Sequence, residues 1–373
     1  MSKPVQLHEY HEKNGHTVDF AGFCLPLWFK GIVIESLTVR NAVGIFDVSH
    51  MGRMIVEGND SCKFLESVTT NEVASLKVRD GHYSLICNEE GGIKDDLMVF
   101  RLADCKYLVV YNAANRSKNC DWFLKNVERK NVELHDISDE TAMFAIQGPK
   151  SVDVLRKIGC ESVGSIPRFC CMWSEIASVS SLITRTGYTG EDGFELTVWD
   201  SPVTSPQKSI VVWEKLLEAG KQYGIEPCGL GARDLLRLEA GLCLYGTDID
   251  EGTNPYEARL GFVVKLNKDF IGRARLAEIK QRGVEKSRIG LTTVSRVIPR
   301  HGFQVLQSGE KVGQITSGSL SPILDKGIAM GYVQTKYARA DSFEIIVRGR
   351  AEEAVRTRFP FYDTVRYGYA RKN

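Results

Sequence analysis

Apolar and polar residues alternate in two distinct ways along most of the chain. Stretches with apolar residues three or four positions apart predict amphipathic helices. Short apolar runs that end in small polar residues predict strands. The predicted helices cover residues 4–14, 34–42, 60–68, 116–130, 150–159, 210–224 and 229–242, and the predicted strands cover residues 43–50, 54–58, 106–115, 143–149 and 182–199.

One further stretch, residues 82–102, has the pattern of a β-hairpin. Two apolar runs flank a polar turn that contains Gly91 and Gly92, and such a turn favours two antiparallel strands. Asp95 and Asp96 follow the turn directly. The hairpin therefore places two neighbouring carboxylates at the start of its second strand.

The pattern changes from about Lys280 onward, where short apolar runs are separated by turns rich in Gly, Ser and Asp. Closely spaced short strands are typical of a small β-barrel or sandwich. We therefore predict an α+β fold with several mixed or antiparallel sheets and flanking helices over residues 1–275, in two interleaved subdomains. Residues 276–373 are predicted to form a carboxy-terminal β-barrel domain.

Composition and charge exclude several classes of protein. The 373 residues include 48 Lys and Arg against 47 Asp and Glu, and this net charge of +1 argues against nucleic-acid binding through gross positive charge. The apolar runs are too short to span a membrane, and the polar amino terminus carries no secretion signal, so a cytoplasmic location is expected. The ten cysteines show no zinc-binding spacing, which predicts reduced, mostly buried thiols and no metal site.

The adjacent pair Asp95 and Asp96 is the first candidate for catalytic chemistry. Neighbours in a strand point to opposite faces, so only one of the two carboxylates can enter a given cleft. Burial and nearby charge shift the pKa of such a group and allow it to take up a proton or hold an amine. Two exposed hairpin aspartates are the alternative.

The second candidate is the segment GYTGEDGFE, residues 187–195. Its glycines permit close approach of the backbone to a ligand, and a carboxylate such as Glu195 can accept two parallel N–H bonds from an aminopyrimidine. A turn-rich hairpin without a ligand explains the same residues equally well. Arg233 and Arg366 could each bind a carboxylate or form a structural ion pair, and His50 could be a general base or a core histidine.

Eight segments occur in order along nearly the whole chain: FAGFCLPL, FDVSHMG, NEEGGIKDDLMV, YNAAN, AIQGP, RTGYTGEDGFE, CGLGARDLLRLEAGLCLYGTDIDE and ITSGSLSP. Together they resemble the aminomethyltransferase family, the T-protein of the glycine cleavage system. The resemblance implies that tetrahydrofolate binds in a central channel closed by the barrel. It also implies transfer of a methylene carbon from the aminomethyl-dihydrolipoyl H-protein to tetrahydrofolate, which yields 5,10-methylenetetrahydrofolate, ammonia and dihydrolipoyl H-protein.

The same resemblance implies roles for individual residues. Asp96 matches the catalytic carboxylate, Glu195 the residue that grips the pterin and Arg233 a folate contact, while Arg366 falls near the contact for the glutamate tail. Phe262 stands where relatives carry tryptophan, and it should keep the stacking contact with less area. Four more positions match residues that line the cavity, namely Met51, Tyr83, Asn112 and Tyr188.

Two other functions share this fold and stay open as alternatives. One is a paralogous folate-dependent demethylase, and the other is a non-catalytic folate-binding protein of the iron–sulfur assembly type. The latter carries a K-G-C-Y-x-G-Q-E segment that this sequence lacks, and the Asp pair also argues against binding alone. A chain so near neutrality would recognise the lipoylated H-protein through a local patch, for which Arg296, Arg300 and Lys311 are candidates. Other glycine cleavage components would be met only indirectly.

Overall fold

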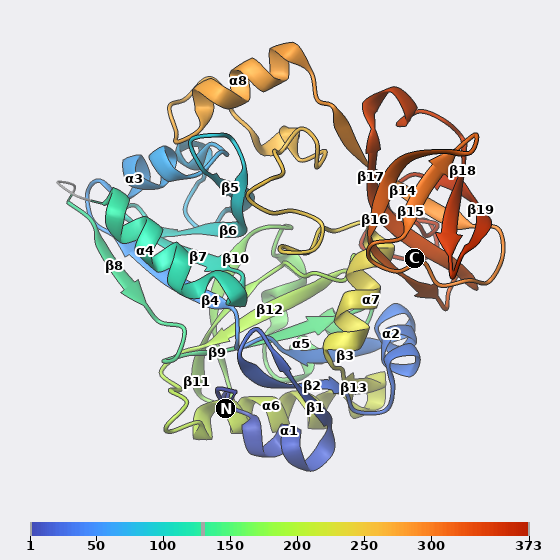
Figure 1. Ribbon diagram of the computed structural model, residues 1–373. Helices are drawn as coiled ribbons and strands as arrows, with labels where there is room; N and C mark the ends of the chain where they lie inside the picture. Colours follow the sequence, from blue (N-terminus) through green and yellow to red (C-terminus); the bar gives the residue numbers. More distant parts are fainter. Residues whose placement is uncertain (1, 128–130, 372–373) are drawn as a thin grey trace.

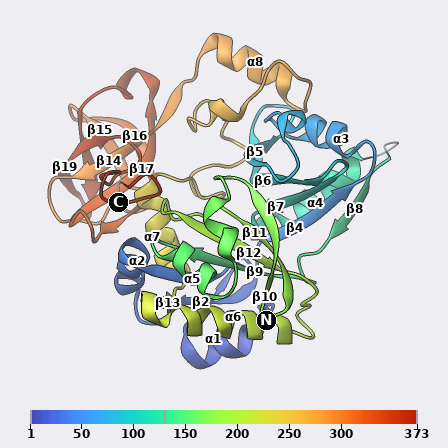
Figure 2. The same ribbon diagram turned by 180° about the vertical axis from the view of Figure 1, so that it is seen from behind.

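The computed structural model describes residues 2–127 and 131–371 (Figure 1). Three sheet-containing parts meet at the centre of the molecule, and Figure 2 shows the same arrangement from behind. Helices cover the outer faces of two of them. The helices are α1 (His8–Asn14), α2 (Ile32–Asn41), α3 (Ser61–Val68), α4 (Arg116–Asn126), α5 (Ser151–Lys157), α6 (Gln207–Gly220), α7 (Leu230–Ala240) and α8 (Arg273–Arg282).

The first part is a six-stranded sheet whose central strands are buried on both faces. Its strands, in spatial order, are β10 (Cys171–Ile176), β11 (Val179–Thr184), β12 (Gly193–Val198), β9 (Ala142–Gln147), β3 (Val43–Asp47) and β13 (Ile225–Pro227). Pairing is antiparallel except between β13 and β3. Alternation along β9 sends Phe144 and Ile146 toward α5 and α6, and sends Met143 and Ala145 toward the opposite face. The central strands are therefore almost continuously apolar in sequence, because both of their faces are buried.

The second part is a five-stranded antiparallel sheet, with strands β5 (Gly81–Cys87), β6 (Ile93–Ala103), β7 (Lys106–Tyr111), β4 (Gly52–Glu57) and β8 (Glu133–Asp136) in spatial order. One face packs under α3 and α4 through Phe64 and Phe123. The other face shares an apolar cluster with the six-stranded sheet, in which Phe100 and Leu108 pack with Met143. This shared cluster holds the two sheets together face to face.

The third part is a closed barrel of β14 (Lys286–Thr293), β17 (Lys326–Gln334), β16 (Glu310–Ser321), β15 (Gln304–Gln307), β18 (Ser342–Val347) and β19 (Arg350–Thr357). Helix α7 joins it to the remainder, because Leu238 packs with Ile328 and Met330 of β17 and with Phe361 beyond the barrel. Ala232 and Leu236 of α7 belong to the same apolar cluster as Phe46 of β3, so this helix lies between the barrel and the six-stranded sheet.

The structure confirms the α+β fold with several sheets and a carboxy-terminal barrel. The hairpin over residues 82–102 is present as β5 and β6, and all ten cysteines are free thiols, five of them buried and five partly buried. The last three residues of the helix predicted over residues 116–130 lie outside the described residues.

Several elements were not predicted, among them α8, β8, β10, β13 and a hairpin of β1 (His16–Phe20) and β2 (Phe23–Trp28). The predicted division after residue 275 falls within α8, whereas the first barrel strand begins at Lys286. The division into domains at that point stays a prediction.

Candidate active site

The two adjacent aspartates lie on β6, opposite Ile86 and Leu85 of β5. The Asp95 side chain is fully buried, while that of Asp96 is only partly buried. Strand geometry turns consecutive side chains to opposite faces of the sheet. One carboxylate therefore lies inside the protein, and the other is left with access to a ligand.

Three asparagine amides surround Asp95. The Nδ2 atoms of Asn112 and Asn115 donate to Asp95 Oδ1 at 2.8 and 2.7 Å, and Asn119 Nδ2 donates to Oδ2 at 2.5 Å. Asn112 follows β7 directly, and Asn119 lies within α4. Asp95 thus connects β6 to the junction between β7 and α4.

Asp96 is bound by two polar side chains that were both predicted to line the cavity. Tyr83 Oη donates to Asp96 Oδ2 at 3.0 Å, and Asn112 Nδ2 donates to Asp96 Oδ1 at 2.8 Å. Tyr83 lies on β5 two positions from the residue that pairs with Asp96, and so it projects from the same face of the sheet. Asn112 bridges the two carboxylates.

Burial governs the protonation of this pair. It raises the pKa of Asp95 to about 7, and the neighbouring charge of Asp96 adds to the shift, whereas the three amides oppose it. Burial also raises the pKa of Asp96, against hydrogen bonds from Tyr83 and Asn112 that favour its charged form. The pair can therefore exchange a proton near neutral pH, as general acid–base chemistry requires.

Asp96, Tyr83 and Asn112 form one polar wall of the candidate site. Glu195 and Arg233 belong to a second polar wall, formed by β12 and α7. Thr186 Oγ1 donates to Glu195 Oε2 at 2.5 Å, while Glu195 Oε1 has no hydrogen-bond partner among the described residues. The Arg233 guanidinium lies 4.7 Å from the centre of the Tyr188 ring, and its nitrogens bond to no other residue in the described ranges. Burial lowers the pKa of Arg233, an effect that Glu195 and Tyr188 oppose. One carboxylate oxygen and one guanidinium are thus available to a ligand.

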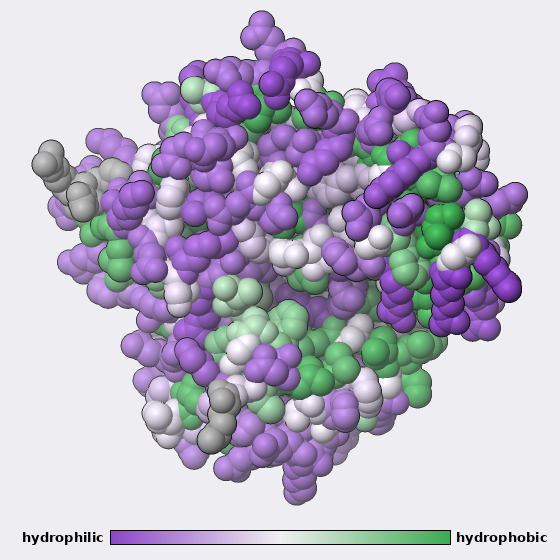
Figure 3. All heavy atoms as spheres, viewed as in Figure 1, coloured by the Kyte–Doolittle hydropathy of each residue, from purple (hydrophilic) through white to green (hydrophobic). Residues whose placement is uncertain are grey.

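Tyr188 connects the two walls. Its hydroxyl donates to the backbone carbonyl of Cys243. Burial raises the pKa of Tyr188, and the charge of Asp96 adds to this shift. Burial raises the pKa of Tyr83 well above its ordinary value, and the nearby Cys243 and Tyr188 raise it further. Asp96, Tyr83, Tyr188 and Cys243 are therefore close enough for their charges to affect one another. Figure 3 shows one face of the molecule, on which hydrophobic and hydrophilic residues are intermixed.

Three other predicted site residues are less closely connected. Met51 is partly buried and packs against the apolar cluster shared by the two sheets. Phe262 is 67% exposed, and Arg366 is exposed with its guanidinium 5.1 Å from the Tyr367 ring centre. No described contact links Phe262 or Arg366 to Asp96 or Glu195. Their roles stay predictions.

His50 is buried, and neither of its ring nitrogens bonds to a described residue. Burial lowers its pKa to about 3, so the imidazole is neutral at physiological pH. Other polar residues of the site were not singled out from the sequence: Asn115, Asn119 and Thr186. The spacing of residues 112, 115 and 119 across a strand-to-helix junction could have indicated the two asparagines, because i and i+4 share a helix face.

Comparison with known proteins places the chain in a family. Two family profiles match it: the GCVT N-terminal domain over residues 7–268, and the glycine cleavage T-protein C-terminal barrel domain over residues 286–363. The chain is 39% identical to a probable aminomethyltransferase from Pyrococcus horikoshii, an alignment that covers 100% of both chains. It is 42% identical to an aminomethyltransferase from Caldanaerobacter subterraneus, over 96% of each chain.

A solved structure supports the same family assignment. The glycine cleavage system aminomethyltransferase T from Bartonella henselae superimposes with a TM-score of 0.90 at 33% identity, over 99% of each chain. The chain therefore belongs to the glycine cleavage T-protein family of aminomethyltransferases. This confirms the family and the enzyme class that the eight ordered segments predicted.

No helix within residues 2–127 or 131–371 is long and apolar enough to cross a membrane. In the same ranges, no group of three or more His, Cys, Asp and Glu side chains is arranged to hold a metal ion.

Replacing Asp95 with asparagine should remove one source of pH dependence from the stability. The folded-state pKa of Asp95 is about 7, above the ordinary carboxyl value of about 4, so the folded chain retains a proton that the unfolded chain loses. This raised pKa makes the wild-type free energy of unfolding fall as pH rises from about 4 to about 7. Relative to wild type, Asp95→Asn should therefore become progressively more stable across that range in denaturant titrations.

The exposed Asp121 of α4 provides the control, since Asp121→Asn should leave the difference from wild type independent of pH. A stability difference between Asp95→Asn and wild type that stays constant from pH 4 to pH 8 would contradict the raised pKa.

Proposed function

We propose that this chain transfers the methylene carbon of an aminomethyl group, carried on the dihydrolipoyl arm of the H-protein, to tetrahydrofolate. The products are 5,10-methylenetetrahydrofolate, ammonia and dihydrolipoyl H-protein. Membership of the family supports this reaction. The observation that carries it is the Asp96 carboxylate, raised in pKa and hydrogen-bonded to Tyr83 and Asn112, in the same environment as Tyr188.

The residues of the second wall fit a folate. The free Oε1 of Glu195 can accept N–H bonds from the aminopyrimidine edge of a pterin, because a carboxylate matches two parallel donors. The unpaired Arg233 guanidinium suits a carbonyl or carboxylate oxygen of the same ligand. Met51, Tyr188 and Phe262 are proposed to contact its rings, and Arg366 its glutamate tail.

When bound, the folate supplies the nitrogen that accepts the one-carbon unit. The protein then has three tasks. Asp96 would take up or deliver a proton as the amine departs, and its raised pKa favours such proton uptake. Tyr83 and Asn112 would hold that carboxylate in one orientation. The surrounding buried walls would align the two reactants and exclude water.

The lipoylated H-protein is the proposed partner. Its arm would deliver the donor at high effective concentration, so docking itself would contribute to the rate. The candidate docking residues all lie on the surface of the barrel region. Arg300 and Lys311 are exposed, and Arg296 is exposed but pairs with Asp325 at 2.9 Å. Lys311 also borders a cleft of about 470 Å³ between the barrel and the loop that contains Asp248.

Asp96→Asn should lower kcat roughly 10-fold or more, which is the usual contribution of a general acid–base group. The affinity for folate should change little, because the amide keeps the shape of the carboxylate and the second wall is intact. Steady-state rates with loaded H-protein and calorimetric titration with tetrahydrofolate measure the two quantities.

Asp95→Asn is the matched comparison, and it should act mainly on stability rather than turnover. If a folded Asp96→Asn enzyme turns over at nearly the wild-type rate, while a folded Asp95→Asn enzyme is inactive, the other carboxylate is the catalytic one.

Glu195→Gln should weaken the binding of tetrahydrofolate by about 1 to 3 kcal/mol, because one acceptor oxygen becomes an amide that cannot accept from the pterin. Titration calorimetry measures the loss. Glu175→Gln, on the exposed face of β10 in the same sheet, is the control and should bind as the wild type does. Equal affinities for the Glu195 variant and this control would remove Glu195 from the pterin site.

A further inference from the structure

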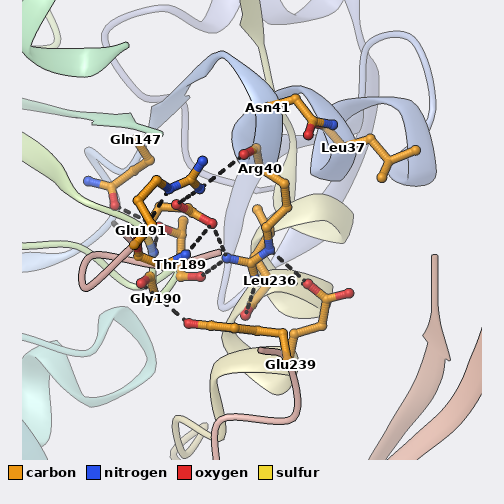
Figure 4. Close-up of polar contacts among 12 residues, drawn as sticks. Leu37, Arg40, Asn41, Gln147, Thr189, Gly190, Glu191, Leu236 and Glu239 are labelled. Atoms are coloured by element: carbon orange, nitrogen blue, oxygen red, sulfur yellow. Dashed lines mark hydrogen bonds and ion pairs between the residues drawn. The ribbon is translucent and has the colours of Figure 1, made fainter. Parts of the chain in front are cut away.

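Arg40, Glu191 and Glu239 form a buried charged cluster (Figure 4), which the partly buried Arg371 joins. Arg40 comes from α2, Glu239 from α7, Glu191 from the loop before β12, and Arg371 from the carboxy-terminal segment. The side chains of Arg40 and Glu191 are fully buried, and that of Glu239 is 1% exposed. The two cations and two anions balance, as burial of charge requires.

Arg40 is the centre of this cluster, and its guanidinium nitrogens all donate hydrogen bonds. Nε and Nη2 donate to Glu239 Oε2 at 3.0 and 2.7 Å, and Nη2 also reaches the Leu236 carbonyl at 3.3 Å. Nη1 donates at 2.9 Å both to Glu191 Oε1 and to the carbonyl of Thr189. Arg40 thus fixes α7 on one side and the turn at residues 189–191 on the other.

The carboxy-terminal segment, residues 359–371, binds the same turn. Backbone N–H groups of Gly368 and Tyr369 donate to Glu191 Oε1 and to the Gly190 carbonyl, both at 3.0 Å. Arg371 donates to Glu191 Oε2 and to the backbone carbonyl of Arg40. The carboxy-terminal segment therefore belongs to the same hydrogen-bond network as Arg40, although Arg40 and Arg371 are 331 residues apart in sequence.

Tyr362 brings this segment into close contact with the turn. Its ring lies 4.6 Å from the Arg40 guanidinium, and its hydroxyl donates to the Gly190 carbonyl at 3.3 Å. Gly190 has φ of +79°, and an added Cβ there would stand 2.3 Å from Tyr362 Oη. Only glycine suits both the backbone conformation and this approach.

The barrel is bound to the same cluster. Ser321, at the end of β16, donates to Glu239 Oε1 at 2.6 Å, and the Phe361 N–H donates to the Glu239 carbonyl at 2.8 Å. Glu239 therefore contacts the barrel, the carboxy-terminal segment and Arg40 at once. The turn at residues 189–191 is therefore held, directly or through Arg40, by α2, α7, the barrel and the carboxy-terminal segment.

We propose that Arg40, Glu191 and Arg371 are positioning residues for folate binding. Through the turn at residues 189–191 they set the places of Tyr188 on one side of it and of Glu195 on the other. This rests on the proposed folate site. Loosening the turn should weaken binding of tetrahydrofolate more than it slows the chemical step, because Asp96 and Tyr83 lie on a separate sheet.

Arg371→Gln tests the proposal, since its side chain lies at the edge of the cluster, 19% exposed, and its loss leaves Arg40 in place. The dissociation constant and KM for tetrahydrofolate should rise about 10-fold, while kcat at saturating folate stays within about 2-fold of wild type. Arg371→Lys keeps the charge on Glu191 and should recover part of the affinity. Arg350→Gln, an exposed arginine of the barrel, should change neither constant.

Tyr362→Phe is a milder second variant, which removes only the hydroxyl that bonds to Gly190. It should raise KM for tetrahydrofolate about 3-fold without lowering the unfolding temperature by more than a few degrees. If both variants fold and bind tetrahydrofolate as tightly as wild type, the cluster is structural only and the proposal is wrong. It is equally wrong if kcat falls while KM is unchanged. A wild-type enzyme that itself fails to bind tetrahydrofolate would overturn the proposed function, and the positioning role with it.

Discussion

The burial of Asp95 is the constraint on which the active site depends. A strand cannot turn two consecutive side chains to the same face, so a chain that presents Asp96 to a ligand must place Asp95 inside the protein. A buried carboxylate is costly unless hydrogen bonds satisfy it. Asn112, Asn115 and Asn119 supply those bonds from the junction of β7 and α4. The position of Asp96, the catalytic candidate, is thus fixed through the hydrogen bonds of Asp95.

The face-to-face packing of two sheets turns this local arrangement into a site. The cluster of Phe100, Leu108 and Met143 holds the sheet that carries Asp96 against the sheet that carries Glu195. Helix α7 then adds Arg233 and packs against the barrel through Leu238. Because the two polar walls come from different elements, we expect substitutions to alter the proposed folate binding and the proposed proton transfer separately.

Several features of the site followed from short-range patterns in the sequence. The 82–102 hairpin and the alternation rule together indicated that Asp95 and Asp96 would differ in exposure, and the structure agrees. The ordered family segments indicated Tyr83 and Asn112, which bind Asp96 directly. Patterns of this kind can be read from a sequence because strand alternation and turn residues act over only a few positions.

The features that were missed depend on tertiary contacts. Helix α8 buries only Leu276 and Ile279, so its apolar periodicity is too short to separate it from a linker. Arg40 and Glu239 stand 199 residues apart, and no local pattern pairs them. Exposure is also a tertiary property, which is why the run LGFVV could not indicate that Phe262 is 67% exposed. Long-range ion pairs and the exposure of single aromatic residues require the folded structure.

We propose that this enzyme moves a one-carbon unit from a protein-bound lipoyl arm to tetrahydrofolate. A single-turnover experiment with aminomethyl-loaded H-protein and tetrahydrofolate tests it, with rapid quenching and quantification of products. We expect one 5,10-methylenetetrahydrofolate and one ammonia for each loaded arm, formed far faster than from free aminomethyl-dihydrolipoamide at equal concentration. Absence of methylenetetrahydrofolate from the loaded carrier, with product formed instead from a small methylated amine, would contradict it and identify a demethylase.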